Sequence, residues 1–198
     1  MADPEGLEDR IRAAAEAADW SRAATVALEG YGPEVLGFLV TLTRNAVDAS
    51  EAFSLFSEGV WRGLPKFRWE ASFRTWAYRL ARRAVWRLRR DPHRRRAVPL
   101  SDAGVSAVVE QVRSRTATFL RTETRDKVAK LRAALEPDDQ ALLVLRVDKK
   151  LPWRDIARVL ADDEDEVAVA ELDRRAATLR KRFERVKADI RERSGRSE

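Results

Sequence analysis

Residues 67–90 read FRWEASFRTWAYRLARRAVWRLRR and contain the side chains that most clearly indicate a chemical partner. The segment holds three of the six Trp of the chain, threaded through a run of Arg with one Glu. Arginine contacts phosphate groups, and exposed aromatic rings stack on unpaired bases. The composition therefore favours a partner that is both anionic and planar, which is nucleic acid.

A helix over residues 72–90 divides these side chains between two faces. Its apolar stripe, at three- and four-residue spacing, consists of Phe73, Trp76, Ala77, Leu80, Ala84 and Leu88. Tyr78 and Trp86 fall on the polar face, so we predict that both rings stay outside the core. Few of the arginines have an acidic partner four residues away, which disfavours a salt-bridged surface. The structural alternative is cation–π pairing of Arg with Trp inside the fold.

The candidate nucleic-acid-binding residues of this segment are Arg74, Trp76, Tyr78, Arg79, Arg82, Arg83, Trp86 and Arg87.

A second basic element lies in the last helix that the sequence predicts. Leu172, Ala176, Leu179, Phe183, Val186 and Ile190 form its amphipathic stripe. This helix follows a shorter helix and a break, as the second helix of a helix-turn-helix does, and it can lie in a major groove. The alternative is an exposed charged helix with no ligand. The candidate residues are Arg174, Arg175, Thr178, Arg180, Lys181, Arg182 and Arg185.

The elements that must position these residues are all helical, and we predict an all-α protein of two small helical domains. The first domain covers residues 1–96, a linker covers 97–124 and the second domain covers 125–198. The expected helices run over 7–29, from Pro33 through Leu42, from an Asp48 cap to Leu64, from a Ser72 cap to Arg90, over 125–135, over 140–147, over 153–160 and over the C-terminal stripe. The residues GYGP at 30–33 are expected to break the chain between the first two helices.

Composition narrows the class of protein further. The chain has 198 residues, a net charge of +6, no Cys and a single His, His93. These numbers disfavour a disulfide framework, a thiolate or multi-His metal site and a Ser-His-Asp triad. No run is long enough to span a bilayer, and the N-terminus lacks a signal-peptide pattern. We therefore expect a cytoplasmic protein that is no enzyme, needs no cofactor and no metal, and has no membrane partner.

The stretch 67–90 resembles the promoter-melting segment of bacterial RNA polymerase sigma factors, in particular the extracytoplasmic-function group of the sigma-70 family. The stretch LEPDDQALLVLRVDKKLPWRDIARVL (135–160) resembles the start of the region-four domain of that group. LRKRFERVK (179–187) is similar to its recognition helix. The resemblance covers about 30–95 and 125–190 of the chain.

This resemblance implies an alternative sigma factor whose partners are core RNA polymerase and promoter DNA. The first domain would bind the −10 element through the candidate residues of 74–87, and the C-terminal helix would bind the −35 element. The helix 48–64 would dock on the β′ clamp, with the β flap as a further polymerase contact. The docking candidates are Glu51, Phe53, Phe56, Glu58 and Trp61. An anti-sigma factor is a further partner that the resemblance implies, although no segment identifies it.

The chain departs from the pattern of that group at three places. Where the docking helix of the group carries DLVQE, this chain has Glu51, Ala52, Phe53, Ser54 and Leu55. Arg83 replaces an Asn beside the base pocket, and the acidic run DDEDE precedes the recognition helix. Two other functions stay open: a stand-alone helix-turn-helix regulator, and an interaction protein that binds polymerase without initiating.

Overall fold

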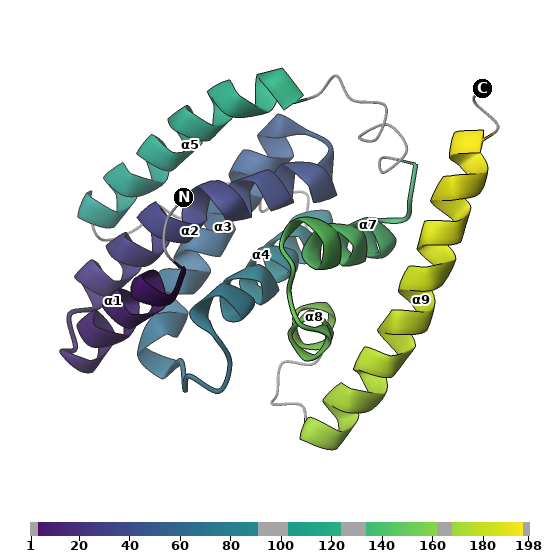
Figure 1. Ribbon diagram of the computed structural model, residues 1–198. Coiled ribbons are helices and arrows are strands. Elements are labelled where there is room, and N and C mark those ends of the chain that lie inside the picture. The colour runs from purple at the N-terminus through teal and green to yellow at the C-terminus, as the bar shows by residue number, and fades with distance from the viewer. Residues whose placement is uncertain (1–3, 91–102, 124–133, 162–167, 196–198) are drawn as a thin grey trace. The chain divides into compact units, whose positions relative to one another are not determined.

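The computed structural model describes residues 4–90, 103–123, 134–161 and 168–195, which fold into helices without a strand (Figure 1). The predicted all-α class is confirmed. The chain forms two compact units, Met1–Thr122 and Glu123–Glu198. Unit 1 contains α1 (Pro4–Glu16), α2 (Trp20–Thr43), α3 (Ala46–Gly63), a 3₁₀ turn (Leu64–Lys66), α4 (Phe73–Arg90) and α5 (Ala103–Glu123). Unit 2 contains α7 (Pro137–Leu143), a π-helical turn (Val144–Asp148), α8 (Trp153–Leu160) and α9 (Val169–Gly195).

Helix α2 runs through the GYGP sequence, so the predicted break at 30–33 is wrong. Gly30 and Gly32 are sites of close approach: a Cβ atom added at Gly30 would lie 2.7 Å from Leu7 Cδ1 of α1. Pro33 stays inside the helix. Packing of neighbouring helices against the two glycines keeps this segment helical and outweighs the local preference of Gly and Pro for a turn.

The chain breaks earlier, between α1 and α2. Ala18 adopts a left-handed φ of 54°, and the Asp19 carboxylate accepts a hydrogen bond from the backbone N–H of Arg22 at 3.0 Å. An Asp in this position satisfies a backbone donor that the first helical turn leaves unpaired. The expected helix over 7–29 is therefore two helices.

Two further helix starts were predicted, and one of them is correct. Helix α4 begins after Ser72, whose Oγ accepts from the backbone N–H of Thr75 at 3.1 Å. Helix α3 is capped by Asn45 rather than Asp48, because Asn45 Oδ1 accepts from the N–H of Val47 and of Asp48 itself. Asp48 lies in the first turn of α3, where its negative charge is favourable.

The core of unit 1 lies between α2, α3 and α4. Its largest side chains are fully buried: Leu28, Phe38, Leu39, Phe53, Phe56, Phe73 and Tyr78. Phe38 meets Tyr78 edge to face with ring centroids 5.0 Å apart, and Phe53 lies 5.6 Å from Phe56. The predicted inward face of α4 is confirmed for Phe73, which is 0% exposed. This core holds α4 against the two helices that precede it.

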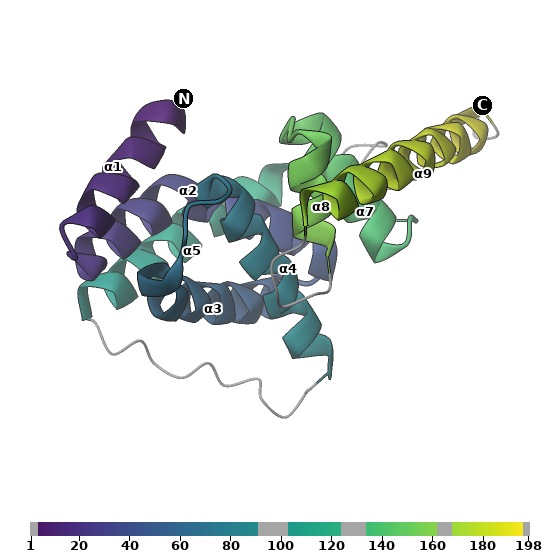
Figure 2. The same cartoon turned by 90° about the horizontal axis from the view of Figure 1, so that it is seen from below.

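Helix α5 occupies most of the segment that we expected to be a linker, 97–124. Its buried stripe consists of Val105, Val108, Val109 and Val112. Figures 1 and 2 both show α5 running alongside α2. A Cβ added at Gly32 would lie 3.1 Å from Val112 Cγ1, so the two helices approach closely at that glycine. Among the side chains of α5 that the structure describes, those of 103–114, the buried stripe is made of valines.

Unit 2 is built around a small cluster of side chains from α8 and α9. Ala157, Leu172 and Ala176 are buried, with Trp153 and Leu179 packed against them. Leu142, Leu145 and Ile156 are also fully buried. The structure describes only residues 134 and 135 of the helix predicted over 125–135. The acidic run at 162–166, His93 and the Arg residues at 94–96 lie outside the described residues.

The two glycines of α2 with different surroundings give a matched test of the α1–α2 contact. We expect Gly30→Ala to lower the free energy of unfolding by about 1–3 kcal/mol relative to Gly37→Ala, because its methyl group must displace Leu7. Gly37 has no atom within 4 Å of an added Cβ, so Gly37→Ala should gain helix propensity of about 1 kcal/mol. Urea unfolding of both variants measures the difference, and equal stabilities would contradict the close approach.

Candidate nucleic-acid interface

The N-terminus of α4 is held by a carboxylate from α1. Glu8 accepts hydrogen bonds from the backbone N–H of Phe73 at 2.7 Å and of Arg74 at 2.9 Å. The hydroxyl of Tyr31 donates to the same carboxylate at 2.9 Å. A carboxylate at this position satisfies two unpaired donors of the first turn and complements the helix dipole. Residue 8 therefore fixes the start of the helix that carries most of the candidate site.

A second carboxylate, Glu34 of α2, holds the side chains of the next turn. Arg74 Nε donates to Glu34 Oε1 at 3.0 Å, and its Nη2 donates to the same oxygen. The Tyr78 hydroxyl also donates to Glu34 Oε1, at 2.5 Å. Since both partners lie on one helix turn, Glu34 fixes the rotation of α4 about its own axis.

Tyr78 is therefore a core residue, and the prediction that its ring stays on the outer face is wrong. It is 1% exposed and packs edge to face on Phe38. Arg74 is half-buried beside it, with its guanidinium committed to Glu34. The helical wheel placed Tyr78 among polar residues, and it missed an acid 44 residues away that gives the hydroxyl a partner.

Burial raises the pKa values of both tyrosines of this network. Burial raises the pKa of Tyr78 far above its ordinary value of 10.0, and the charge and hydrogen bond of Glu34 add to the effect. Burial, with the hydrogen bond to Glu8, likewise raises the pKa of Tyr31. Both hydroxyls keep their protons and act as donors to carboxylates throughout the physiological range.

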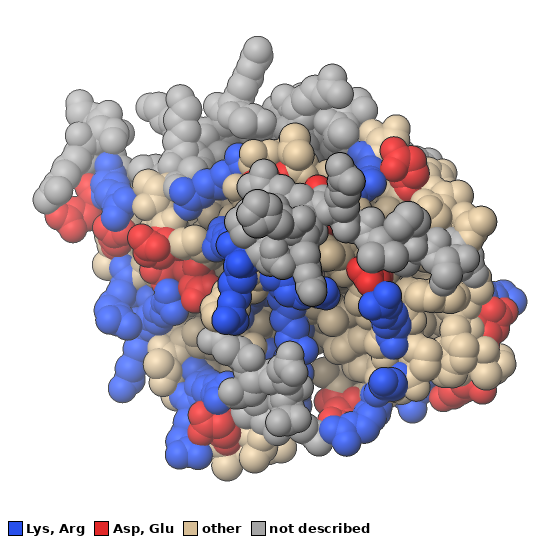
Figure 3. Space-filling view, turned by 180° about the vertical axis from the view of Figure 1, so that it is seen from behind, with Lys and Arg blue, Asp and Glu red and all other residues tan. Residues whose placement is uncertain are grey.

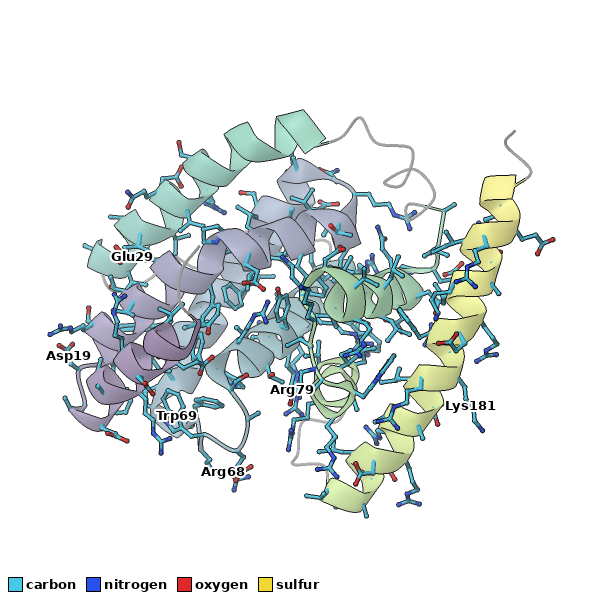
Figure 4. All side chains as sticks on the ribbon, viewed as in Figure 1. Asp19, Glu29, Arg68, Trp69, Arg79 and Lys181 are labelled. Carbon is cyan, nitrogen blue, oxygen red and sulfur yellow. The ribbon has the colours of Figure 1, made fainter. Side chains whose placement is uncertain are left out.

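Aromatic side chains ahead of α4 form a cluster that the predicted helix over 72–90 did not include. Phe67 stacks on Trp76 with ring centroids 4.7 Å apart and lies 4.8 Å from the ring of Trp69. Trp69 has a left-handed φ of 59°, which is rare for a bulky residue, and Arg12 lies over its ring at 5.6 Å. Figure 4 shows Trp69 and Arg68 in the loop ahead of α4. The FRW sequence at 67–69 was the signal for these rings.

The far end of α4 presents an aromatic ring between cations. Trp86 is 43% exposed. Among the described side chains, every other aromatic ring is buried or half-buried. The guanidinium groups of Arg82 and Arg90 lie 5.9 and 5.8 Å from its ring centre. Arg82 is only 6% exposed, whereas Arg90 is exposed. The prediction that Trp86 stays outside is consistent with this exposure.

The remaining basic candidates of α4 differ in how accessible they are. Arg79 and Arg83 are half-buried, and Arg87 is exposed. Arg89, which was not among the candidates, donates from Nη2 to the backbone oxygen of Leu42 at 2.9 Å and so ties α4 to the end of α2. The most accessible cations on α4 lie in its last turns, around Trp86.

The docking candidates on α3 lie on two different faces. Phe53 and Phe56 are 0% and 1% exposed, so their rings are part of the core and do not reach a partner in this structure. Glu58 accepts an ion pair from Arg62 at 2.9 Å, with 11% of its side chain exposed. Glu51 and Trp61 are half-buried. The accessible edge of α3 therefore carries Glu51 and Arg62, whereas Glu58 is buried beside Arg62.

The candidates on α9 also separate into paired and accessible cations. Arg174 and Arg175 both pair with Glu171, at 2.8 and 2.9 Å, and Arg182 pairs with Asp139 of α7 at 2.5 Å. The Thr178 hydroxyl donates to the backbone oxygen of Arg174.

Three other cations of α9 are exposed and take no part in these ion pairs. Arg180 is exposed and lies 5.8 Å from the ring centre of Trp153. Lys181 and Arg185 are exposed and form no ion pair with any described residue. Figure 4 shows Lys181 projecting outward from α9. They are one turn apart, so both can contact the same phosphate backbone.

Basic side chains are prominent on the described surface, in line with the net charge of +6. Figure 3 shows a face on which Lys and Arg side chains gather, with Asp and Glu in smaller groups. Within the described residues, no three His, Cys, Asp or Glu side chains are arranged to hold a metal ion. In the same residues, no helix is both long enough and apolar enough to cross a membrane.

The buried tyrosines predict how stability depends on alkaline pH. Above pH 10 the unfolded chain loses tyrosine protons that the folded chain retains, so stability should fall as pH rises. Each tyrosine contributes a slope of about 1.4 kcal/mol per pH unit in this range. We expect Tyr78→Phe to remove one of these contributions, measured by urea unfolding between about pH 10 and 11.5.

The chain has two Tyr, so the double variant Tyr31→Phe/Tyr78→Phe is the matched reference for this slope. An unchanged slope in Tyr78→Phe would show that the hydroxyl at residue 78 is accessible to water.

One comparison with known proteins bears on this geometry. Residues 27–96 match the family model of sigma-70 region 2, over about a third of the chain. No curated protein and no solved structure gave a match. The matched residues include α3, the aromatic loop and the whole of α4. Residues 27–96 are therefore similar to sigma-70 region 2, which supports a sigma factor of the sigma-70 family.

Proposed function

We propose that this chain is an alternative sigma factor of the extracytoplasmic-function group, a non-enzymatic specificity subunit of bacterial RNA polymerase. The observation that carries the proposal is the region 2 match over residues 27–96, in which α4 presents Trp86 among arginines. A stacking ring beside phosphate-binding cations suits a strand whose bases are unpaired. The proposed role is to bind core polymerase, recognise a promoter and melt it.

The proposed −10 surface is the accessible part of α4 with the loop ahead of it. Trp86, Arg83 and Arg87 would contact the melted strand, while Trp76 and Arg79 lie on its half-buried border. Arg74, Tyr78 and Arg82 would act by fixing the helix, because their side chains are paired or buried. Arg83 stands where the group has an Asn, so base preference at −10 is expected to differ from that of the group.

Melting needs the energy of a larger assembly. Opening about ten base-pair steps costs on the order of 14 kcal/mol, and stacking one extruded base returns about 1–3 kcal/mol. A single exposed ring on α4 therefore supplies a small part of the cost. The chain is expected to melt DNA only when core polymerase adds its own contacts, which we propose are made by the accessible edge of α3 to the β′ clamp and by unit 2 to the β flap.

Unit 2 is proposed to read the −35 element through α9. Lys181 and Arg185 are exposed and unpaired among the described residues, so they are the best placed for phosphate contacts. Arg174, Arg175 and Arg182 are engaged with acids of the same unit. They would reach a groove only after giving up those ion pairs. An anti-sigma factor is proposed as a further partner from the resemblance alone.

Run-off transcription tests the proposal against its two rivals. With core polymerase and a library of promoter fragments, a sigma factor gives defined transcripts, and the free chain binds duplex DNA weakly. A stand-alone regulator would bind duplex DNA tightly without polymerase. An interaction protein that sequesters polymerase would bind core and give no open complex. Absence of both core binding and transcripts would refute the proposed function.

Trp86 gives a specific prediction for melting. We expect Trp86→Ala to reduce open-complex formation about fivefold or more, which corresponds to the loss of about 1–3 kcal/mol of stacking. Trp86→Phe keeps a planar ring and should retain most of the activity. Permanganate reactivity of the holoenzyme–promoter complex measures melting, and urea unfolding measures stability. Lower stability with unchanged melting would show that Trp86 only packs against Arg82 and Arg90.

The ion pairs of α9 give a second prediction. Lys181→Ala and Arg185→Ala should each reduce the salt dependence of promoter binding, lowering the slope of log K against log salt by about one. Arg182→Ala is the matched control, because Asp139 already neutralises that cation. We expect it to change stability more than the salt slope. Equal slopes for all three variants would place the DNA contact elsewhere.

A further inference from the structure

Helix α5 is anchored on α3 by one arginine. Arg113 Nη2 donates to the backbone oxygen of Ser50 at 2.7 Å and also to Ser54 Oγ. Ser50 and Ser54 lie one turn apart on α3, so one guanidinium reaches both. The contact joins residues 63 and 59 positions apart in the sequence, so it is a tertiary contact inside unit 1.

The valine stripe of α5 packs beside this anchor. Val112 lies against Gly32, where an added Cβ would be 3.1 and 3.2 Å from its two methyl groups. The same Cβ would lie 3.4 Å from Phe53 Cζ, so Val112 sits at the seam between α2 and α3. Small residues at 32, 50 and 54 are what allow α5 to approach the two helices.

The anchor coincides with the proposed polymerase-docking motif. Ser54 stands where the sigma group has the Gln of DLVQE, and Leu55 stands where it has the Glu. Glu51 begins the same five residues, and Glu58 follows one turn after Ser54. Arg113 therefore occupies a position within the stretch of α3 that a polymerase clamp would need to contact.

We propose that α5 is an internal competitor of core polymerase for α3, and that it must leave Ser50 and Ser54 before the clamp docks. This inference rests on the proposed function. The free chain would be a covered form of the factor, and binding of core would be coupled to release of α5. The apparent affinity for core then equals the intrinsic affinity multiplied by the fraction of chains in which α5 has left α3.

The contact has the properties of one that can be released. Among the described side chains of α5, the apolar part of the contact is a stripe of four valines, and the residues between them are exposed. Within the described residues, Arg113 Nε is buried without a hydrogen-bond partner, so the anchor leaves one donor unsatisfied. An unsatisfied buried donor opposes the closed state. Polymerase contacts to α3 need only exceed the free energy that still favours α5 bound to α3.

A reversible crosslink tests the proposal in the full chain. The chain has no Cys, so Gly32→Cys/Val112→Cys introduces a single thiol pair. The methyl carbons of Val112 lie 3.1 and 3.2 Å from a Cβ at residue 32, which is compatible with disulfide geometry. We expect the oxidised double variant to bind core polymerase at least about tenfold more weakly than the same protein after reduction. Each single-Cys variant should be insensitive to oxidation.

Three outcomes of this experiment have distinct meanings. Equal affinity of the oxidised and reduced forms, with both supporting transcription, would overturn the competition while the proposed sigma function stands. Failure of the reduced form and of the unmodified chain to bind core would overturn the proposed function and the competition with it. Failure of the thiols to pair under oxidation would show that residues 32 and 112 are not adjacent, and it would also overturn the inference.

A second variant tests the same competition without a crosslink. Arg113→Ala removes the anchor on Ser50 and Ser54, so it should bind core about threefold or more tightly than the unmodified chain. Gln111→Ala is the control, because Gln111 is exposed on the same helix and lies off the contact. Unchanged or weaker binding by Arg113→Ala, with a native helical spectrum, would contradict the proposal.

Discussion

Two carboxylates hold the helix on which the proposed DNA contacts depend. Glu8 binds the first backbone donors of α4, and Glu34 binds Arg74 and Tyr78 one turn later. Together they set where α4 begins and which face it turns outward, and that rotation leaves Trp86 exposed. Glu8 belongs to α1, which precedes the residues that match sigma-70 region 2. The surface of the matched segment therefore depends on a helix outside the match.

Ion pairs and hydrogen bonds within the fold explain why a count of basic residues overstates the number available to DNA. Arg74 and Arg182 are held by acids more than 39 residues away, and Arg89 binds the end of α2. These arginines organise the two units. The cations left accessible, such as Arg87 on α4 and Lys181 on α9, lie off the apolar stripes. A fold rich in Arg can thus use some of these side chains for its own packing and leave others for an anionic partner.

The sequence predicted the local features of this fold better than the tertiary ones. The helical class and the Ser72 cap follow from composition and short spacings, and the structure confirms both. Helix continuity through Gly30–Pro33 and the burial of Tyr78 depend on partners distant in the chain, Leu7 and Glu34. No local pattern encodes those partners. The docking candidates illustrate the same point. The motif predicts that Phe53 contacts a partner, whereas the structure places its ring in the core.

We propose that the chain opens promoter DNA only together with core polymerase, through the exposed end of α4. A permanganate footprint of the reconstituted holoenzyme on genomic DNA distinguishes this from melting by the chain alone. We expect reactive thymines over a short segment upstream of each start site, present with holoenzyme and missing with the chain alone or core alone. Reactivity with the chain alone, or core binding without any reactive segment, would contradict it.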